Sequence, residues 1–125
     1  MKRVISIALV LIMLSLVVLV SCNTPDNETA LNFTVKVEHL DGSVKTFEYS
    51  SQKAMLGDAL LEEGLISGYE SQYGLTVTTV DGTYYDWESS NTYWALYIDG
   101  EYAMTGVDST PITEGQTYTL KAETY

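Results

Sequence analysis

Aromatic side chains with a polar edge are the residues of this chain best suited to chemistry, and that chemistry is noncovalent binding. The chain has ten tyrosines and two tryptophans but only two phenylalanines. Tyrosine and tryptophan combine apolar area with a polar edge, which suits sites that are half exposed to water. They gather in the segment 82–94, GTYYDWESSNTYW, between two expected strands. The candidate ligand-binding residues are Tyr84, Tyr85, Trp87, Asn91, Tyr93 and Trp94.

Two interpretations of the 82–94 segment stay open at the level of sequence. An irregular loop carried by a rigid sheet would present Tyr84, Tyr85 and Trp87 to a ligand or partner. Alternatively, the segment forms a further short strand whose rings close the open end of the core. Trp94 alternates with Leu96 along an expected strand, which favours a core position over a ligand contact.

Groupings that could support catalysis or metal binding do not stand out in the sequence. His39 is the only histidine, and it follows the first expected strand beside a turn, where a surface position is favoured. The serines lack a second histidine or a Gly-x-Ser-x-Gly elbow. Acids such as Glu62 and Glu63 sit near helix ends, and no spacing matches a calcium loop. We therefore expect no enzyme activity, no metal site and no certain cofactor.

Cys22 is the only cysteine, and its position indicates lipidation. Lys2 and Arg3 precede an apolar run from residue 4 to 20, which is typical of an export signal. The residues LVSC at 19–22 resemble a bacterial lipobox, with an aliphatic residue followed by small Ser21 before the cysteine. We expect cleavage before Cys22, its modification with palmitate or a similar acyl chain, and a lipoprotein held at the extracytoplasmic face of the cell membrane. The alternative is an uncleaved anchor helix that ends in a chance cysteine.

Composition divides the chain into a signal peptide at residues 1–21, a flexible tether at 22–30 and one small domain at 31–125. The tether is polar and aperiodic. A domain of this length can bury a single core, and one lipidated cysteine leaves no thiol for disulfides. The net charge of −11 excludes nucleic acid as a partner and favours an acidic, soluble surface.

The first expected elements form a hairpin. Phe33, Val35 and Val37 alternate on one strand, and Phe47 and Tyr49 alternate on the return strand. A two-residue turn would place these two sets on opposite faces, so we predict a three-residue loop at 40–42. That loop pairs Phe33 with Tyr49 and Val35 with Phe47.

The rest of the domain is expected to contain one helix and four more strands. Ser50 or Ser51 is expected to cap the helix and Gly64 to end it. Strands are expected at 75–80, 93–98, 101–104 and 117–123, with a three-residue loop at 98–100 that pairs Trp94 with Met104 and Leu96 with Tyr102. This order predicts an α+β, β-grasp-like domain with a single mixed sheet and one crossing helix.

The second half of the chain resembles the DUF4430 family of bacterial exported proteins, which is similar to the C-terminal β-domain of transcobalamin and intrinsic factor. The resemblance rests on YGLTVTTVDG, YWALYIDGEYAMTGVD and ITEGQTYTLKAETY and extends over residues 31–125. Gln116 stands where the family usually has an acid.

The resemblance implies a β-grasp-like fold and non-catalytic ligand binding. In the transcobalamin relatives this domain closes over one face of cobalamin beside a larger helical domain, so cobalamin or a related small molecule is a candidate ligand. The alternative is a structural or interaction module that docks on a transporter or envelope component.

Overall fold

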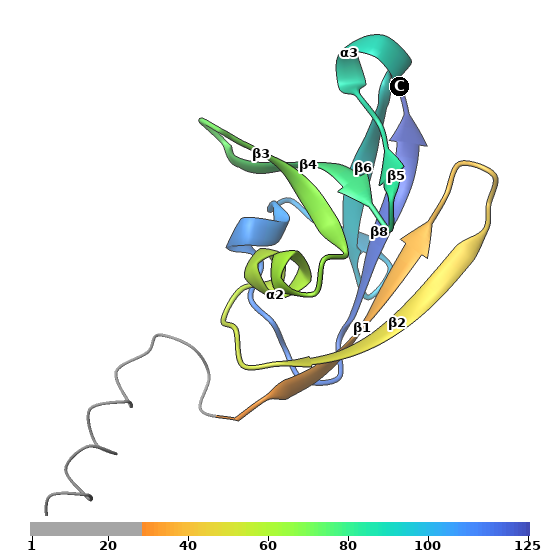
Figure 1. Cartoon of the computed structure of the whole chain (residues 1–125). Helices are drawn as coiled ribbons and strands as arrows, with labels where there is room; N and C mark the ends of the chain where they lie inside the picture. Colours follow the sequence, from red (N-terminus) through yellow and green to blue (C-terminus); the bar gives the residue numbers. More distant parts are fainter. Residues whose placement is uncertain (1–28) are drawn as a thin grey trace, which may run out of the picture.

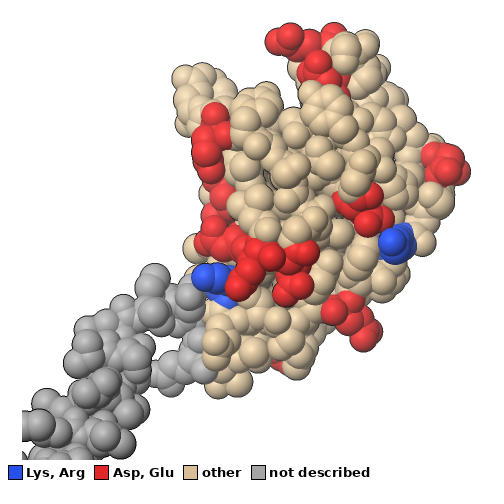
Figure 2. All heavy atoms as spheres, viewed as in Figure 1, with Lys and Arg blue, Asp and Glu red and all other residues tan. Residues whose placement is uncertain are grey.

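The computed structural model describes residues 29–125 (Figure 1). The predicted signal peptide, Cys22 and the tether up to residue 28 lie outside the described residues. Within the described part, no helix is long and apolar enough to cross a membrane. Figure 2 shows many acidic and few basic side chains on the face it presents, in keeping with the acidic composition.

A five-stranded sheet forms one layer of the domain. Its strand order is β2-β1-β8-β6-β7, in which β1 and β8 are parallel and the other neighbours are antiparallel. The strands are β1 (Leu31–Glu38), β2 (Val44–Ser51), β6 (Thr92–Ile98), β7 (Glu101–Tyr102) and β8 (Thr117–Thr124).

A second sheet and short helical segments form the other layer. The sheet has three antiparallel strands, β3 (Ile66–Ser71), β4 (Gly74–Val80) and β5 (Thr83–Tyr84). The helical segments are α2 (Leu56–Glu62), α3 (Trp87–Ser90) and the 3-10 turn η1 (Val107–Ser109). The described chain is therefore β-rich with two sheets.

The predicted single mixed sheet with one crossing helix is wrong. The residues of β3, ISGYES, bury only Ile66 fully, and Gly68 interrupts the segment, so the alternation typical of a strand is missing from the sequence. β3 pairs with β4 along its whole length, with a bulge at Ser67 and Gly68. This pairing draws β4 into a separate sheet instead of the main one.

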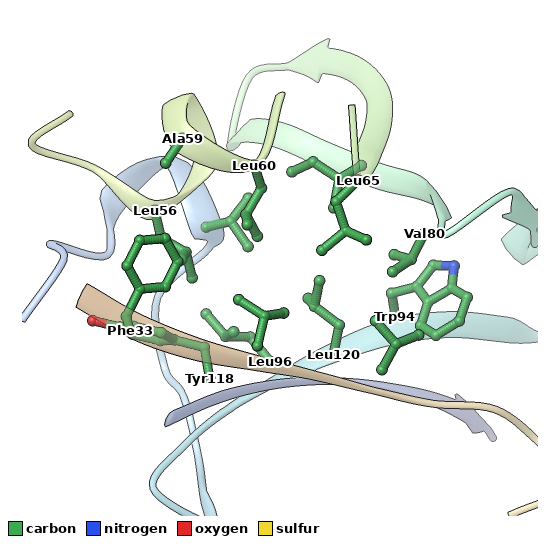
Figure 3. Close-up of a cluster of buried hydrophobic side chains, with 14 of the residues drawn as sticks. Phe33, Leu56, Ala59, Leu60, Leu65, Val80, Trp94, Leu96, Tyr118 and Leu120 are labelled. Carbon is green, nitrogen blue, oxygen red and sulfur yellow. The ribbon is translucent and has the colours of Figure 1, made fainter. Parts of the chain in front are cut away.

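The core lies between the two layers (Figure 3). Val35 and Leu120 on the main sheet are almost fully buried, as are Leu56 and Leu60 on α2 and Val80 on β4. Side chains alternate between the two faces along a strand. The opposite face of the main sheet therefore carries polar residues that neighbour the buried ones in sequence, namely Thr34, Lys36, Thr119 and Lys121.

The first hairpin has the predicted register. Phe33 pairs with Tyr49 and Val35 with Phe47. The His39 N–H donates to the Ser43 carbonyl at 2.9 Å, which closes a three-residue loop, and Gly42 has a φ of +87°. The prediction from apolar register is confirmed.

The second hairpin has a different register from the predicted one. Tyr97 pairs with Tyr102 and Ile98 with Glu101, so the loop has two residues, Asp99 and Gly100, both with positive φ. Such a turn matches the twist of antiparallel strands. The predicted pairs failed because Tyr102 and Met104 are exposed and no core constrains their register; their exposed fractions are 54% and 91%.

The helix α2 ends as predicted but begins differently. Gly64 has a φ of +73°, and its N–H donates to the Leu61 carbonyl, which ends the helix. Neither predicted serine caps it, because β2 continues to Ser51, whose hydroxyl accepts the Lys53 N–H. The Leu56 N–H instead donates to the Thr110 carbonyl at 2.8 Å.

Candidate functional site

A cleft of about 240 Å³ opens where β4 faces β6, close to the segment that follows β7. Figure 1 shows β4 crossing from its hairpin toward β6. We name this hollow the β4–β6 cleft. No charged side chain belongs to its walls, which consist of Leu75, Thr76, Val77, Tyr93, Trp94, Ala95, Leu96, Tyr102, Ala103, Thr105, Gly106, Val107 and Leu120.

One wall of the β4–β6 cleft is the edge of a strand. Residues 93–96 of β6 all line it, although successive side chains point to opposite faces of a sheet. A wall made of consecutive residues must therefore include the backbone. β7 pairs only with Tyr97 and Ile98, so the preceding part of β6 has no neighbouring strand on this side.

The hydrogen bonds of β6 determine which backbone groups face the β4–β6 cleft. The Asp99 N–H donates to Thr117 on the β8 side at 2.8 Å, and Tyr125 N–H donates to the Asn91 carbonyl at 3.2 Å. Odd-numbered residues of β6 therefore direct their N–H and C=O toward β8, and even-numbered ones direct theirs away. In agreement, the Leu96 carbonyl accepts the Ala103 N–H at 2.9 Å on the opposite side.

Three backbone groups consequently point at this free edge: the N–H and C=O of Trp94 and the N–H of Leu96. Among residues 29–125, no backbone or side-chain hydrogen bond reaches them outside the strand ladders, and no strand pairs there. Trp94 and Leu96 are only 8% and 7% exposed. Buried backbone polar groups are normally paired with protein or water, so this edge needs a partner.

The indole of Trp94 adds another unpaired group. Its Nε1 is buried, and no described residue accepts its hydrogen. The ring packs against Tyr85, with centroids 5.3 Å apart, and against the edge of His39 at 5.9 Å. Trp94 is thus a core residue, as its alternation predicted. It lines the β4–β6 cleft and, within the described part of the chain, has two N–H donors without an acceptor, one on the backbone and one on the indole.

The structure does not bring the six sequence-predicted candidates together at one site. Tyr93 and Trp94 line the β4–β6 cleft. Tyr84 lies on β5 and is exposed, whereas Tyr85 packs against the core. The 82–94 segment therefore contains a short strand and also displays rings, so each sequence-level interpretation describes part of it.

The remaining candidates, Trp87 and Asn91, belong to α3 and its end, just before the first residue of β6. Trp87 begins α3 and is 47% exposed, and Asn91 closes that helix with a φ of +50°. The Trp87 ring meets Tyr125 at 4.2 Å, and Tyr93 stacks on Tyr125 at 4.9 Å. We name Trp87, Tyr93 and Tyr125 the aromatic cluster.

Glu123 fixes the tyrosines next to the aromatic cluster. Its carboxylate accepts hydrogen bonds from the hydroxyls of Tyr93, at 2.9 Å, and Tyr97. These hydrogen bonds, together with burial and the charge of Glu123, raise the pKa of both phenols above the ordinary value. Both tyrosines therefore stay neutral donors, and their role here is positional.

Sequence reasoning missed the wall opposite β6. Asp108 in η1 accepts the Leu75 N–H at 3.0 Å and so fixes the start of β4 beside the cleft. Leu75, Val77 and Thr105 carry no pattern that sets them apart as site residues. They meet only because β4 belongs to a second sheet, which the sequence did not predict.

Other hollows occur on the described surface, and some are larger. One beside Ser50, Gln52 and Glu63 has mostly polar walls, and another lies at Ile98 and Glu101. None of them includes the free edge of β6 at Trp94. The β4–β6 cleft is therefore the better candidate site.

Comparison with known families agrees with the sequence resemblance. The model of the family described as a domain of unknown function, DUF4430, matches residues 54–124. The chain belongs to the DUF4430 family. The predicted membership is confirmed, and β1 and β2 both lie before the matched region of this DUF4430 member. No curated protein matches the sequence.

Two solved structures are similar to this DUF4430 domain. A candidate metal-binding protein from Ruminococcus gnavus ATCC 29149 has 33% identity and a TM-score of 0.72, over 76% of this chain and 98% of its own. Haptocorrin in complex with Cbi has 14% identity and a TM-score of 0.67, over 84% of this chain. The DUF4430 chain spans 28% of haptocorrin, and this similarity supports the transcobalamin-like link at the level of fold.

The first neighbour is named for metal binding, which requires a set of ligand side chains gathered around one point. Within residues 29–125, no group of three or more His, Cys, Asp or Glu side chains is arranged to hold a metal ion. The β4–β6 cleft has apolar walls and no carboxylate, imidazole or thiol among them. Its donor set does not fit a metal ion.

Proposed function

We propose that this protein is a lipid-anchored lipoprotein of the extracytoplasmic membrane face, whose small domain binds a ligand in the β4–β6 cleft without catalysing a reaction. The observation that carries this proposal is the set of unpaired polar groups on Trp94, namely its buried indole Nε1–H and the backbone N–H and C=O that face the cleft. Apolar walls that surround a few convergent polar groups are the usual makeup of a ligand site.

The unpaired polar groups of Trp94 favour the binding of a ligand in the β4–β6 cleft. A buried donor or acceptor without a partner costs about 1–3 kcal/mol. Ordered water can recover part of this cost in the free protein. A ligand that hydrogen-bonds to Trp94 and covers Leu75 and Val77 would replace that water and also bury apolar surface, so its binding gains from both.

Cobalamin or a related small molecule is our candidate ligand. Support comes from the family resemblance and from the fold similarity to haptocorrin, which was crystallised with Cbi. Cavities that enclose a ligand of drug size measure about 300–1,000 Å³. The β4–β6 cleft, at about 240 Å³, is smaller, so it would hold one edge of a corrinoid and leave the rest to solvent or a partner.

Calorimetric titration tests the proposed site. The full chain in detergent micelles is titrated with cobinamide and with hydroxocobalamin. Thr105→Phe adds a ring to a residue that lines the cleft, whereas Met104→Phe adds the same ring to the adjacent residue, which does not line it. We expect Thr105→Phe to weaken binding about tenfold or more, equivalent to about 1.4 kcal/mol, and Met104→Phe to bind like the wild type.

Each other result has a definite meaning. Equal affinity in all three proteins would move the site away from the β4–β6 cleft. No binding of either corrinoid would remove cobalamin as the candidate ligand. Far-ultraviolet circular dichroism of both variants checks that a loss of affinity is not a loss of folding.

Lipid anchoring has its own test. Cells expressing the chain are labelled with palmitate, and Cys22→Ala is the matched control. We expect label in the membrane fraction of the wild type and none in Cys22→Ala. An unlabelled wild-type protein in the cytosol would contradict both the anchor and the extracytoplasmic location.

The aromatic cluster favours a second candidate function, docking on a transporter or envelope component. Tyr125 is 82% exposed, and it lies with half-exposed Trp87 on one end of the domain. A photo-crosslinker at position 87 should capture a transporter subunit in intact cells, whereas the same group at Thr46, on the outer face of β2, should not. Equal capture at both positions would contradict docking through the cluster.

A further inference from the structure

We infer that the free edge of β6 at Trp94 recognises a neutral carboxamide group of the ligand. This inference rests on the proposed function and specifies the chemical class that the β4–β6 cleft selects. It follows from the direction of the unpaired backbone groups, the absence of charge in the walls and the charge that lies just behind them.

The backbone of Trp94 requires a donor and an acceptor side by side. In an extended strand, the N–H and C=O of one residue point to the same side, and a neighbouring strand pairs with both at once. A primary carboxamide offers an acceptor oxygen and a donor N–H on the same edge of one flat group. It can therefore pair with both groups of Trp94, and a longer ligand can also present an acceptor to the Leu96 N–H.

Other ligand groups leave either the N–H or the C=O of Trp94 without a hydrogen-bond partner. A carboxylate has only acceptors and would place its charge against the Trp94 carbonyl. A disubstituted amide accepts but cannot donate. Because a buried group left without a partner costs about 1–3 kcal/mol, these ligands should bind more weakly by roughly tenfold.

Electrostatics also favour a neutral group. The walls of the β4–β6 cleft contain no charged side chain, so a charged ligand group would lose water without gaining an ion pair. Behind the β4 wall, the carboxylate of Asp108 accepts the Leu75 N–H at 3.0 Å. This carboxylate and the net charge of −11 on the chain both disfavour an anion.

The carboxamide that we infer is a primary side amide of a small molecule such as a corrinoid. The competing occupant is an extended peptide that adds to the edge of β6. Because the C=O and N–H of a trans peptide group lie on opposite edges, the peptide would pair with Trp94 through the N–H and C=O of one residue, which belong to two successive peptide groups. The experiment separates the two occupants.

Nuclear magnetic resonance of the ¹⁵N-labelled full chain in micelles tests the inference with three matched probes: acetamide, N,N-dimethylacetamide and acetate. Titration with acetamide should move the Trp94 amide proton downfield, as expected for a new hydrogen bond. N,N-dimethylacetamide should bind about tenfold more weakly, and acetate should leave the Trp94 signal unchanged. Thr105→Phe should abolish the acetamide shifts, and Met104→Phe should keep them.

The outcomes separate this inference from the proposed function. If acetate or N,N-dimethylacetamide shifts Trp94 as strongly as acetamide, or if acetamide does not shift the Trp94 signal, the carboxamide inference is overturned. Corrinoid binding that Thr105→Phe blocks would then still support the proposed function. If acetamide acts as expected, titrations with cobinamide and with a blocked trialanine peptide show which occupant reaches Trp94.

Discussion

The two hairpins of the main sheet start from similar sequences and end differently. In the first, β1 and β2 pair over eight residues each, and β1 also pairs with β8, so both of its edges are used. In the second, β6 and β7 pair at only two positions before the chain turns away. The first hairpin forms one edge of the sheet with a full-length strand, β2, whereas the short β7 of the second hairpin leaves part of the β6 edge without a neighbouring strand in the described chain.

The difference in strand pairing between the two hairpins indicates where the domain has backbone groups available to bind a ligand. Register in the first hairpin is fixed because Phe33, Val35, Phe47 and Tyr49 must face one core. The residues of β7 face no core, so the turn geometry alone decides their register. The early departure of the chain after β7 then leaves the backbone of Trp94 without a neighbouring strand.

The largest expected effect comes from breaking the packed hairpin. Phe33→Ala should lower the free energy of unfolding by about 3–5 kcal/mol, because it leaves a cavity beside Tyr49 and Tyr118. Tyr102→Ala, on β7, should change it by about 0.5 kcal/mol, because that ring is more than half exposed. Urea unfolding followed by circular dichroism measures both, and equal losses would contradict the comparison.

A smaller effect is expected from the turn glycines. Gly42 and Gly100 have φ of +87° and +86°, and a Cβ at either would meet nothing within 4 Å. Gly42→Ala and Gly100→Ala should therefore each cost about 1 kcal/mol through backbone strain alone. Thr46→Ala on the outer face is the control in the same urea assay. A loss at only one glycine would mean that the two turns do not share this requirement.

The smallest effect concerns the turn aspartates at low pH. Hydrogen bonds from Ser43 lower the pKa of Asp41, and those from Thr117 and Gln116 lower the pKa of Asp99, below the ordinary value of 3.8. A depressed folded-state pKa stabilises the fold above 3.8, and this stability is lost as the pH falls through the folded-state value.

Asn substitution keeps an acceptor in each turn but removes the titration. Asp41→Asn and Asp99→Asn should each flatten the fall in the urea midpoint below about pH 4, while Asp58→Asn, on α2, serves as the control. A curve as steep as that of the wild type in both turn variants would show that these carboxylates contribute nothing to acid sensitivity.

Short-range sequence patterns predicted the features that depend on apolar alternation toward the core or on a glycine at a helix end. Alternation gave the register of Phe33 with Tyr49, and Gly64 gave the end of α2. These patterns failed where tertiary contacts decide. Gly68 interrupts the strand pattern of β3 in the sequence, although β3 pairs with β4 in the structure. The first turn of α2 is held by a hydrogen bond to the Thr110 carbonyl, which is distant in sequence.

The candidate site was predictable only in part, for the same reason. Tyr93 and Trp94 stood out by residue type, and both line the β4–β6 cleft. The opposite wall, with Leu75 and Val77, depends on a second sheet that short-range patterns do not encode. The free edge of β6 exists because β7 is only two residues long. No residue in the segment 101–104 indicates that strand pairing stops after Tyr102.

Amide hydrogen exchange of the ligand-free full chain in micelles tests the central claim most directly. Ala95 directs its N–H toward β8, and Trp94 directs its N–H toward the β4–β6 cleft. We predict that the Trp94 amide exchanges about a hundredfold faster than the Ala95 amide under native conditions. Equal protection of the two amides would contradict the open edge, and with it the proposed site.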